Sequence, residues 1–158
     1  MSTTNTERLA ALGLTLPPVQ RPAAAYVPAV RHGDLVIVSG QLPFVDATLA
    51  ATGFVGDGPG EHDVATAAEL ARHCALNVLA AAAAVAGGLD AVASVLRVGV
   101  FVASGDDFTQ QHLVANGASE LIGAVLGPHA VHARAAVGVA RLPLDAPVEV
   151  EAMLTVAA

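Results

Sequence analysis

The sequence predicts an α+β fold, a two-layer sandwich in which two main helices cover one face of a mixed β-sheet. Two stretches, residues 63–87 and 106–125, repeat apolar residues at steps of three or four, which is the period of an amphipathic helix. Shorter stretches that are β-branched, or that alternate between apolar and polar residues, predict strands. With a short helix at the N-terminus, the predicted order of elements is α, ββ, α, β, α, ββ.

Composition indicates a single domain over residues 1–158. Hydrophobic residues make up 54% of the chain and charged residues 13%, which is enough apolar material for a core without disulfides or metal ions. The one cysteine, Cys74, lies in an apolar helical pattern, where we expect a buried structural thiol. The longest apolar run, residues 78–89, is too short for a bilayer, and charges at positions 7 and 8 do not suit a signal peptide. We therefore expect a soluble, cytoplasmic protein without membrane contact.

Charge excludes several classes of function. The net charge is −7, every cationic side chain other than histidine is an arginine, and lysine is absent. Schiff-base chemistry, lysine-dependent pyridoxal phosphate catalysis and the P-loop all need a lysine, so they are excluded. A chain this acidic offers no basic face to a nucleic-acid backbone, and we expect no nucleic-acid partner.

The N-terminal residues 1–22 predict a short helix and an extended arm. Residues 4–12 form the helix, which Thr4 or Asn5 caps and Gly13 ends. Three prolines in the following stretch prevent a helix there and predict an extended path over the surface.

Two strands and a loop are expected next. Residues 25–31 and 35–39 are rich in β-forming residues and flank a His-Gly-Asp turn, which predicts a hairpin. Residues 41–60 are rich in Gly, Pro, Asp and Thr and predict a loop, with one weak strand near residues 53–55.

The second half of the chain contains the main helices and three more strands. The helix over 63–87 ends at a pair of glycines, and its many small buried residues suit close packing on a sheet. Residues 93–103 predict a central strand, and the helix over 106–125 begins near two aspartates. Residues 131–140 and 147–156 alternate in polarity and predict a terminal antiparallel hairpin.

Arg134 is the first candidate for chemistry. It lies in a predicted strand among alanines and a glycine, so its guanidinium has space around it and a rigid backbone beneath it. Such a group suits a carboxylate bound through two parallel hydrogen bonds. The alternative is a purely structural ion pair with Glu149 or Glu151 on the strand that follows.

Glu149 and Glu151 form the second candidate. They are two residues apart in a predicted strand, so they share a face and each raises the pKa of the other. One of them is suited to act as a general acid or base. The alternative is the solvated face of an edge strand. No spacing of His, Cys, Asp or Glu predicts a metal site, and no glycine pattern predicts a dinucleotide. Ser39 and Gly40 end a strand with exposed backbone groups that suit a small ligand.

These residues together resemble the RidA family, also called YjgF or endoribonuclease L-PSP. The resemblance rests on Tyr26, the stretch 38–43 (Val-Ser-Gly-Gln-Leu-Pro), Arg134, the stretch 141–143 (Arg-Leu-Pro) and the stretch 148–152 (Val-Glu-Val-Glu-Ala). It covers the chain from Tyr26 to the end. The additional N-terminal helix is similar to a longer branch of that family.

The resemblance implies a chorismate-mutase-like fold, a homotrimer with sites in the clefts between subunits, and no cofactor. Typical family members hydrolyse reactive 2-imino acids or their enamine tautomers to 2-oxo acids and ammonia. By the same resemblance, Arg134 grips the substrate carboxylate, Glu149 helps to activate water and Tyr26 lines the cleft. Ser39 and Gly40 are implied to contact the ligand.

Two positions depart from the typical deaminases. His112 stands where those enzymes have an asparagine, and Ala136 stands where they often have a cysteine, so we expect a pocket of different shape. Three functions follow as hypotheses: an imine deaminase, a non-catalytic trimer that binds or senses a small carboxylate, and, by fold similarity alone, a chorismate-mutase-type pericyclic enzyme. Ribonuclease activity, which the wider family has been credited with, is disfavoured by the net charge and the absence of lysine.

Overall fold

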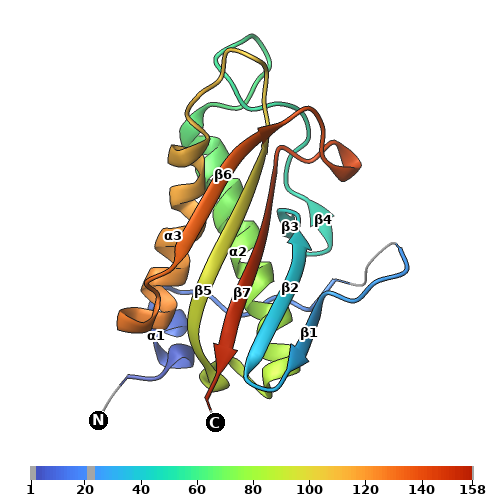
Figure 1. The fold of residues 1–158 in the computed structure, drawn as a ribbon. Helices are drawn as coiled ribbons and strands as arrows, with labels where there is room; N and C mark the ends of the chain where they lie inside the picture. Colours follow the sequence, from blue (N-terminus) through green and yellow to red (C-terminus); the bar gives the residue numbers. More distant parts are fainter. Residues whose placement is uncertain (1–2, 21–23, 158) are drawn as a thin grey trace.

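The computed structural model describes residues 3–20 and 24–157, and in it two long helices cover one face of a five-stranded sheet (Figure 1). The strand order is β1-β2-β7-β5-β6, and every neighbouring pair is antiparallel except β5 and β6. This arrangement confirms the predicted α+β class. The strands are β1 Ala29–His32, β2 Leu35–Gln41, β5 Val92–Ala103, β6 Ala133–Val139 and β7 Val148–Val156, and the long helices are α2 Val64–Ala86 and α3 Gln111–Leu126.

The N-terminal helix α1 spans Asn5–Ala11 and is tied to the rest of the molecule. Thr4 caps it, in a reciprocal capping box with Glu7. Asn5 donates to two backbone carbonyls beside the start of β5 at 3.0 and 2.8 Å, and Arg8 donates to a carbonyl in the last turn of α3 at 2.6 Å. Residues 14–20 of the expected arm form neither helix nor strand, and its last two positions lie outside the described residues.

The hairpin of β1 and β2 turns at Gly33, whose φ of +59° is the left-handed conformation that the predicted turn requires. β1 begins four residues later than expected, so Tyr26 lies in a bend before the strand. The predicted loop contains a small hairpin of β3 Phe44–Val45 and β4 Thr48–Leu49, which the sequence analysis missed. The weak strand expected near residues 53–55 is reduced to isolated bridges of Val55.

Helix α2 matches its prediction to within a residue at each end. Asp63 caps it by accepting the Thr66 amide at 2.8 Å, and Gly87 ends it with a φ of +96°. Among the described residues α2 alone is long and apolar enough to cross a membrane, yet 61% of that window is buried inside the protein. The thiol of Cys74 is fully buried on this helix, as expected, and burial raises its pKa well above the ordinary value.

Helix α3 begins at Gln111, so the expected start at residue 106 is wrong. Residues 106–110 form a turn and an irregular stretch, and Gln110 occupies the N-cap position without a capping side chain. Phe108 within this stretch is buried, and Gln111 Nε2 donates to its carbonyl at 2.7 Å. Asp106 and Asp107 suit the N-terminus of a helix, which is why the sequence predicted that the helix begins too early.

The expected terminal hairpin is also wrong, because β6 and β7 are not neighbours. β6 pairs in parallel with β5, while β7 lies between β2 and β5. Parallel strands need a crossover connection, and α3 supplies one between β5 and β6. The alternation of residues along both strands determined which face each residue occupies, but alternation carries no information about which strands pair.

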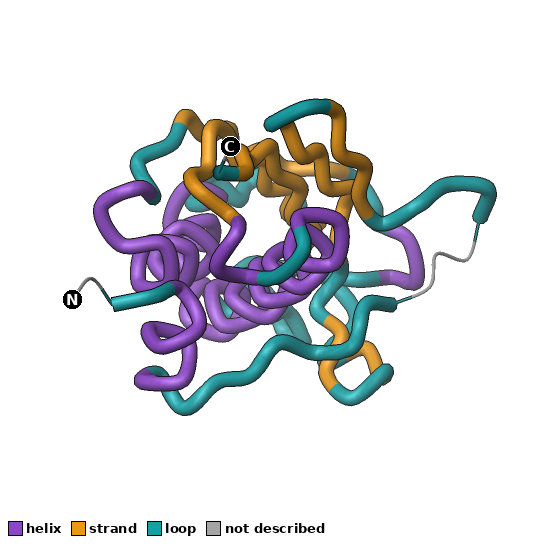
Figure 2. Tube along the Cα trace, turned by 90° about the horizontal axis from the view of Figure 1, so that it is seen from below, coloured by secondary structure: helices purple, strands orange, loops and turns teal. Residues whose placement is uncertain are grey.

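The five-stranded sheet has one covered and one open face. Figure 2 shows the sheet nearly end-on, with the helices on one side of it. On the covered face, valines and leucines of all three central strands are fully buried. On the open face, register places four exposed apolar side chains on four strands: Val30, Ile37, Val137 and Met153.

The packing of α2 against α3 depends on a glycine. A Cβ at Gly117 of α3 would clash with the backbone carbonyl of Ala68 on α2, and neither backbone can move without separating the helices. We expect Gly117→Ala to lower the free energy of unfolding by about 1–3 kcal/mol. Gly123 on the same helix has open space at its Cβ position, so Gly123→Ala should raise that free energy by about 0.5–1 kcal/mol. Urea denaturation of both variants checks these two predictions, and equal changes in the free energy of unfolding would contradict them.

Candidate functional site

The two candidate carboxylates occupy the open face of β7, where the sequence placed them together. The Arg97 guanidinium on β5 pairs with the Glu151 carboxylate at 3.0 Å. Glu149 makes no ion pair with the described residues. Burial, and secondarily the negative charge of Glu151, raise the pKa of the Glu149 carboxyl above its ordinary value. Glu149 is therefore the better suited of the two to exchange a proton with a substrate or water.

Glu149 has neighbours from β2 that the sequence also singled out. Its carboxyl lies over Gly40, where any Cβ would clash with it, so the absence of a side chain makes room for the acid. Ser39 Oγ donates to the carbonyl of Val27 at 2.9 Å, which attaches the segment bearing Tyr26 to the end of β2. Tyr26 itself is 53% exposed. We call these four residues the Glu149 half-site: Tyr26, Ser39, Gly40 and Glu149.

Arg134 lies on the other face of the sheet, next to α3. In the parallel register it pairs with Val98, whose side chain is fully buried on the helix-covered face. Its Nη1 donates to Asn116 Oδ1 at 3.0 Å and to Ser119 Oγ at 3.1 Å, and its Nη2 donates to the His112 carbonyl at 3.0 Å. The guanidinium remains exposed.

These bonds leave part of the guanidinium available. Of its five N–H donors, three are bound to α3. The Nε–H and one Nη2–H have no acceptor among the described residues. Nε and Nη2 lie along the same edge of a guanidinium, so this edge can bind both oxygens of a carboxylate. α3 thus holds Arg134 through Nη1 and one hydrogen of Nη2, and it leaves the edge of Nε and Nη2 exposed for a carboxylate.

The structural alternatives for both candidates are contradicted. Arg134 pairs with neither glutamate, and Glu151 is bound by Arg97 instead. β7 is an internal strand, so Glu149 does not sit on the solvated face of an edge strand.

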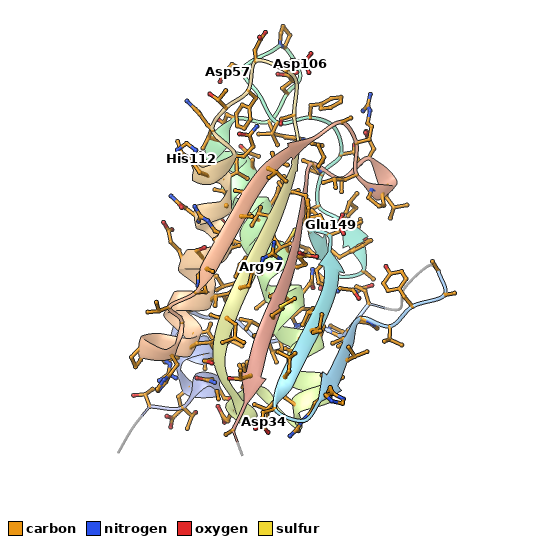
Figure 3. All side chains as sticks on the ribbon, viewed as in Figure 1. Asp34, Asp57, Arg97, Asp106, His112 and Glu149 are labelled. Atoms are coloured by element: carbon orange, nitrogen blue, oxygen red, sulfur yellow. The ribbon has the colours of Figure 1, made fainter. Side chains whose placement is uncertain are left out.

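The two departures from the typical deaminases both lie beside Arg134. His112 supplies its carbonyl to the guanidinium and holds an exposed side chain at the first turn of α3 (Figure 3). Ala136 is two residues beyond Arg134 in β6 and partly buried, so it shares the covered face. Asn116 and Ser119 were not predicted as site residues, although two polar residues at i and i+3 in an apolar helix indicate a polar contact on that face. We call this group the Arg134 half-site: His112, Asn116, Ser119, Arg134 and Ala136.

Among the residues that the structure describes, no group of three or more His, Cys, Asp or Glu side chains is placed to hold a metal ion. The acidic residues near the start of α2 serve the backbone instead. Glu61 accepts the Gly58 amide at 2.8 Å, and Asp63 caps α2.

Comparison with known proteins decides the family. A family model described as endoribonuclease L-PSP matches residues 18–156, nearly the whole chain. The chain belongs to this family, which is also called RidA or YjgF. Protein TCP17 of Trypanosoma cruzi is 45% identical over 144 residues, which cover 90% of this chain and 88% of that protein.

Two solved structures show the same RidA fold. The Agrobacterium tumefaciens protein Atu1372 is 46% identical, covers 97% of this chain and 92% of its own, and superposes with a TM-score of 0.86. The YjgF gene product of Escherichia coli is 29% identical, with 87% and 92% coverage and a TM-score of 0.58.

For this RidA-family chain, the residues that the resemblance assigned to one site fall into two groups. The Glu149 half-site lies on the open face, whereas Arg134 faces the helix layer. One strand, β5, separates the strands that carry them. A single copy therefore places Glu149 over Gly40, with Ser39 beside it and Tyr26 in the bend next to the Val27 carbonyl that Ser39 binds, but it does not bring these residues to Arg134.

Proposed function

We propose that this RidA-family protein is a cytoplasmic, cofactor-free hydrolase that converts reactive 2-imino acids, or their enamine tautomers, to 2-oxo acids and ammonia. One observation carries the proposal: α3 holds Arg134 by three donors and leaves a two-donor edge exposed for a carboxylate. The raised pKa of Glu149 supplies the acid–base group that hydrolysis requires.

The mechanism follows from these two groups. Arg134 binds the substrate carboxylate and so fixes the position of the adjacent imine carbon, which is already electrophilic. The imine enters with its nitrogen protonated. The Glu149 carboxylate accepts a proton from a water molecule while the water oxygen bonds to that carbon, and the C=N electron pair moves to the nitrogen, which becomes a neutral amine. The protonated Glu149 then returns its proton to the amine. The C–N bond breaks as the C=O bond forms, the hydroxyl proton passes to the Glu149 carboxylate and from it to the departing ammonia, and ammonium and the 2-oxo acid leave.

A complete site requires a second copy of the chain, because one copy keeps the half-sites apart. The open face of the sheet supports this requirement, since it carries apolar side chains exposed to solvent on four strands. We propose that three copies associate through this face, so that Arg134 of one copy meets Glu149 of the next.

The assembly gives a prediction of its own. Light scattering coupled to size-exclusion chromatography should give three times the chain mass of 15.7 kDa across micromolar concentrations. A charge placed at the centre of the apolar face, Ile37→Glu, should shift the mass toward one copy and abolish activity together, because the site would then be incomplete. A wild-type mass of a single chain would contradict the composite site.

The activity itself is tested with substrates made in situ. An amino-acid oxidase or a serine dehydratase generates 2-iminopropanoate or 2-aminoacrylate, and the release of ammonia is followed with and without this protein. We expect a faster release with the protein. Rates equal to those in buffer would contradict the deaminase proposal.

A second candidate function is a non-catalytic receptor for small carboxylates. One observation favours it: E. coli TdcF, which is 26% identical with a TM-score of 0.60 over 89% of this chain and 93% of its own, was solved with bound serine. A receptor would be stabilised against heat by pyruvate or serine and would release no additional ammonia. An enzyme would show both effects.

A further inference from the structure

Behind Arg134 a chain of hydrogen bonds runs through two residues that the proposed mechanism does not use. The Ser119 hydroxyl oxygen lies 3.1 Å from Arg134 Nη1 and 3.0 Å from His132 Nε2. The other ring nitrogen, His132 Nδ1, lies 2.6 Å from the carbonyl oxygen of Ala130. Ser119 and His132 are both partly buried, so water competes only in part for these bonds.

When the His132 ring is neutral, the Ala130 carbonyl sets the direction of each hydrogen bond in this series. A carbonyl oxygen only accepts, so His132 Nδ1 carries a hydrogen and donates it to Ala130. In the neutral ring Nε2 is then an acceptor, and the Ser119 hydroxyl donates to it. The lone pairs of Ser119 Oγ remain for the Nη1–H of Arg134. Each bond thus orients the next, from the Ala130 carbonyl to the guanidinium.

The sequence places these groups by simple spacing. His132 and Arg134 are two residues apart along an extended segment, so they point to the same side. On α3, His112, Asn116 and Ser119 are spaced by four and three residues and occupy one helix face. Arg134 therefore meets three acceptors on α3, of which only Ser119 is itself oriented by another side chain.

We propose that Ser119 and His132 are positioning residues, which hold the Arg134 guanidinium so that its Nε edge faces the ligand carboxylate. This inference rests on the proposed function for its ligand, but the ordering of Arg134 can be measured without any ligand. It also assigns a purpose to a serine and a histidine that otherwise have no part in the fold's core.

Two variants and a matched control test this proposal. In Ser119→Ala the guanidinium loses one acceptor, and in His132→Phe the serine hydroxyl loses its orientation. We expect the dissociation constant for pyruvate, measured by calorimetric titration, to rise about tenfold in Ser119→Ala, and by a smaller factor in His132→Phe. The matched control is Ser94→Ala. It removes a partly buried hydrogen bond between the hydroxyls of Ser94 on β5 and Thr155 on β7, which are 2.6 Å apart, and it should leave the dissociation constant unchanged.

The double variant separates positioning from a general loss of structure. Because His132 acts through Ser119, adding His132→Phe to Ser119→Ala should weaken pyruvate binding no further. In turnover assays both single variants should raise KM and leave kcat within about twofold of the wild type, since neither residue touches the reacting atoms. If the losses of pyruvate affinity in the two single variants add up in the double variant, His132 does not act through Ser119 and the proposal is overturned.

A measurement without ligand distinguishes the failure of this inference from the failure of the proposed function. The Nε–H resonance of Arg134 in ¹⁵N NMR spectra should be sharp in the wild type and in Ser94→Ala, and broadened in Ser119→Ala. If wild-type protein binds no pyruvate but this pattern is observed, the proposed function fails and the positioning role stands. If the resonance and the affinity are both unchanged in Ser119→Ala, the inference is overturned.

Discussion

Replacement of Arg134 by lysine is expected to weaken pyruvate binding by about two orders of magnitude, although the positive charge is kept. A lysine ammonium cannot offer the paired Nε–H and Nη2–H edge, and it cannot at the same time occupy the Asn116, Ser119 and His112 acceptors on α3. The loss should appear in calorimetric titration with pyruvate and as a matching drop in kcat/KM for imine hydrolysis.

The matched control for this variant is Arg31→Lys. Arg31 is an arginine of the edge strand β1, at the opposite end of the strand order from β6, and within the described part of the chain it donates to two backbone carbonyls. We expect Arg31→Lys to bind pyruvate like the wild type. An Arg134→Ala variant with undiminished deaminase activity would end the proposed mechanism.

Glu149→Gln is expected to lower kcat by about 10²-fold while the affinity for pyruvate stays nearly unchanged. The amide cannot accept a proton from water, yet it retains the size of the carboxyl and still fits over Gly40. The matched control is Glu151→Gln, which removes the neighbouring acid and its exposed ion pair with Arg97 but no proton acceptor from the mechanism. Equal losses of kcat in the two variants would contradict the assignment of Glu149 as the base.

The same variant should be more stable than the wild type at neutral pH. Folding raises the pKa of Glu149 above its ordinary value near 4.5, so the native state keeps this proton to a higher pH than the unfolded chain does. Between the two pKa values the native state binds more protons, and its stability falls as the pH rises through that window. Glu149→Gln cannot ionise, so it does not show this fall in stability with rising pH. Melting curves from pH 4 to pH 8 should show a higher melting temperature for Glu149→Gln only above the window.

Local sequence was sufficient for the elements whose ends are marked by individual residues. Asp63 and Gly87 mark the two ends of α2, and Gly33 forms the turn of the first hairpin. Caps and left-handed positions restrict the backbone within a few residues, so these ends can be located from the local sequence. The two long helices and the strands were predicted from the period of their apolar residues, which is also a local property of the sequence. The candidates Arg134 and Glu149 were found because each stands out against small or apolar neighbours in its own strand.

Pairing between distant segments required the tertiary structure. The alternation in β6 and β7 is equally compatible with a hairpin and with two strands separated by β5, and the hairpin was the wrong choice. The order of the strands also decides which charged groups surround Arg134 and Glu149. As hairpin partners Arg134 and Glu149 would neutralise each other, whereas in the observed order Glu151 pairs with Arg97 and Arg134 turns to α3.

The sequence by itself determined the class of the fold and the extent of α2, and it singled out Arg134 and Glu149 as the candidates to bind a carboxylate and to move a proton. Only the tertiary structure decided that these groups lie on opposite faces, that Ser119 and His132 stand behind Arg134, and that Glu149 is buried enough to keep its proton longer. The division has a physical reason. Periodicity and caps act over a few bonds, while strand neighbours and burial depend on free energies shared by residues far apart in the chain.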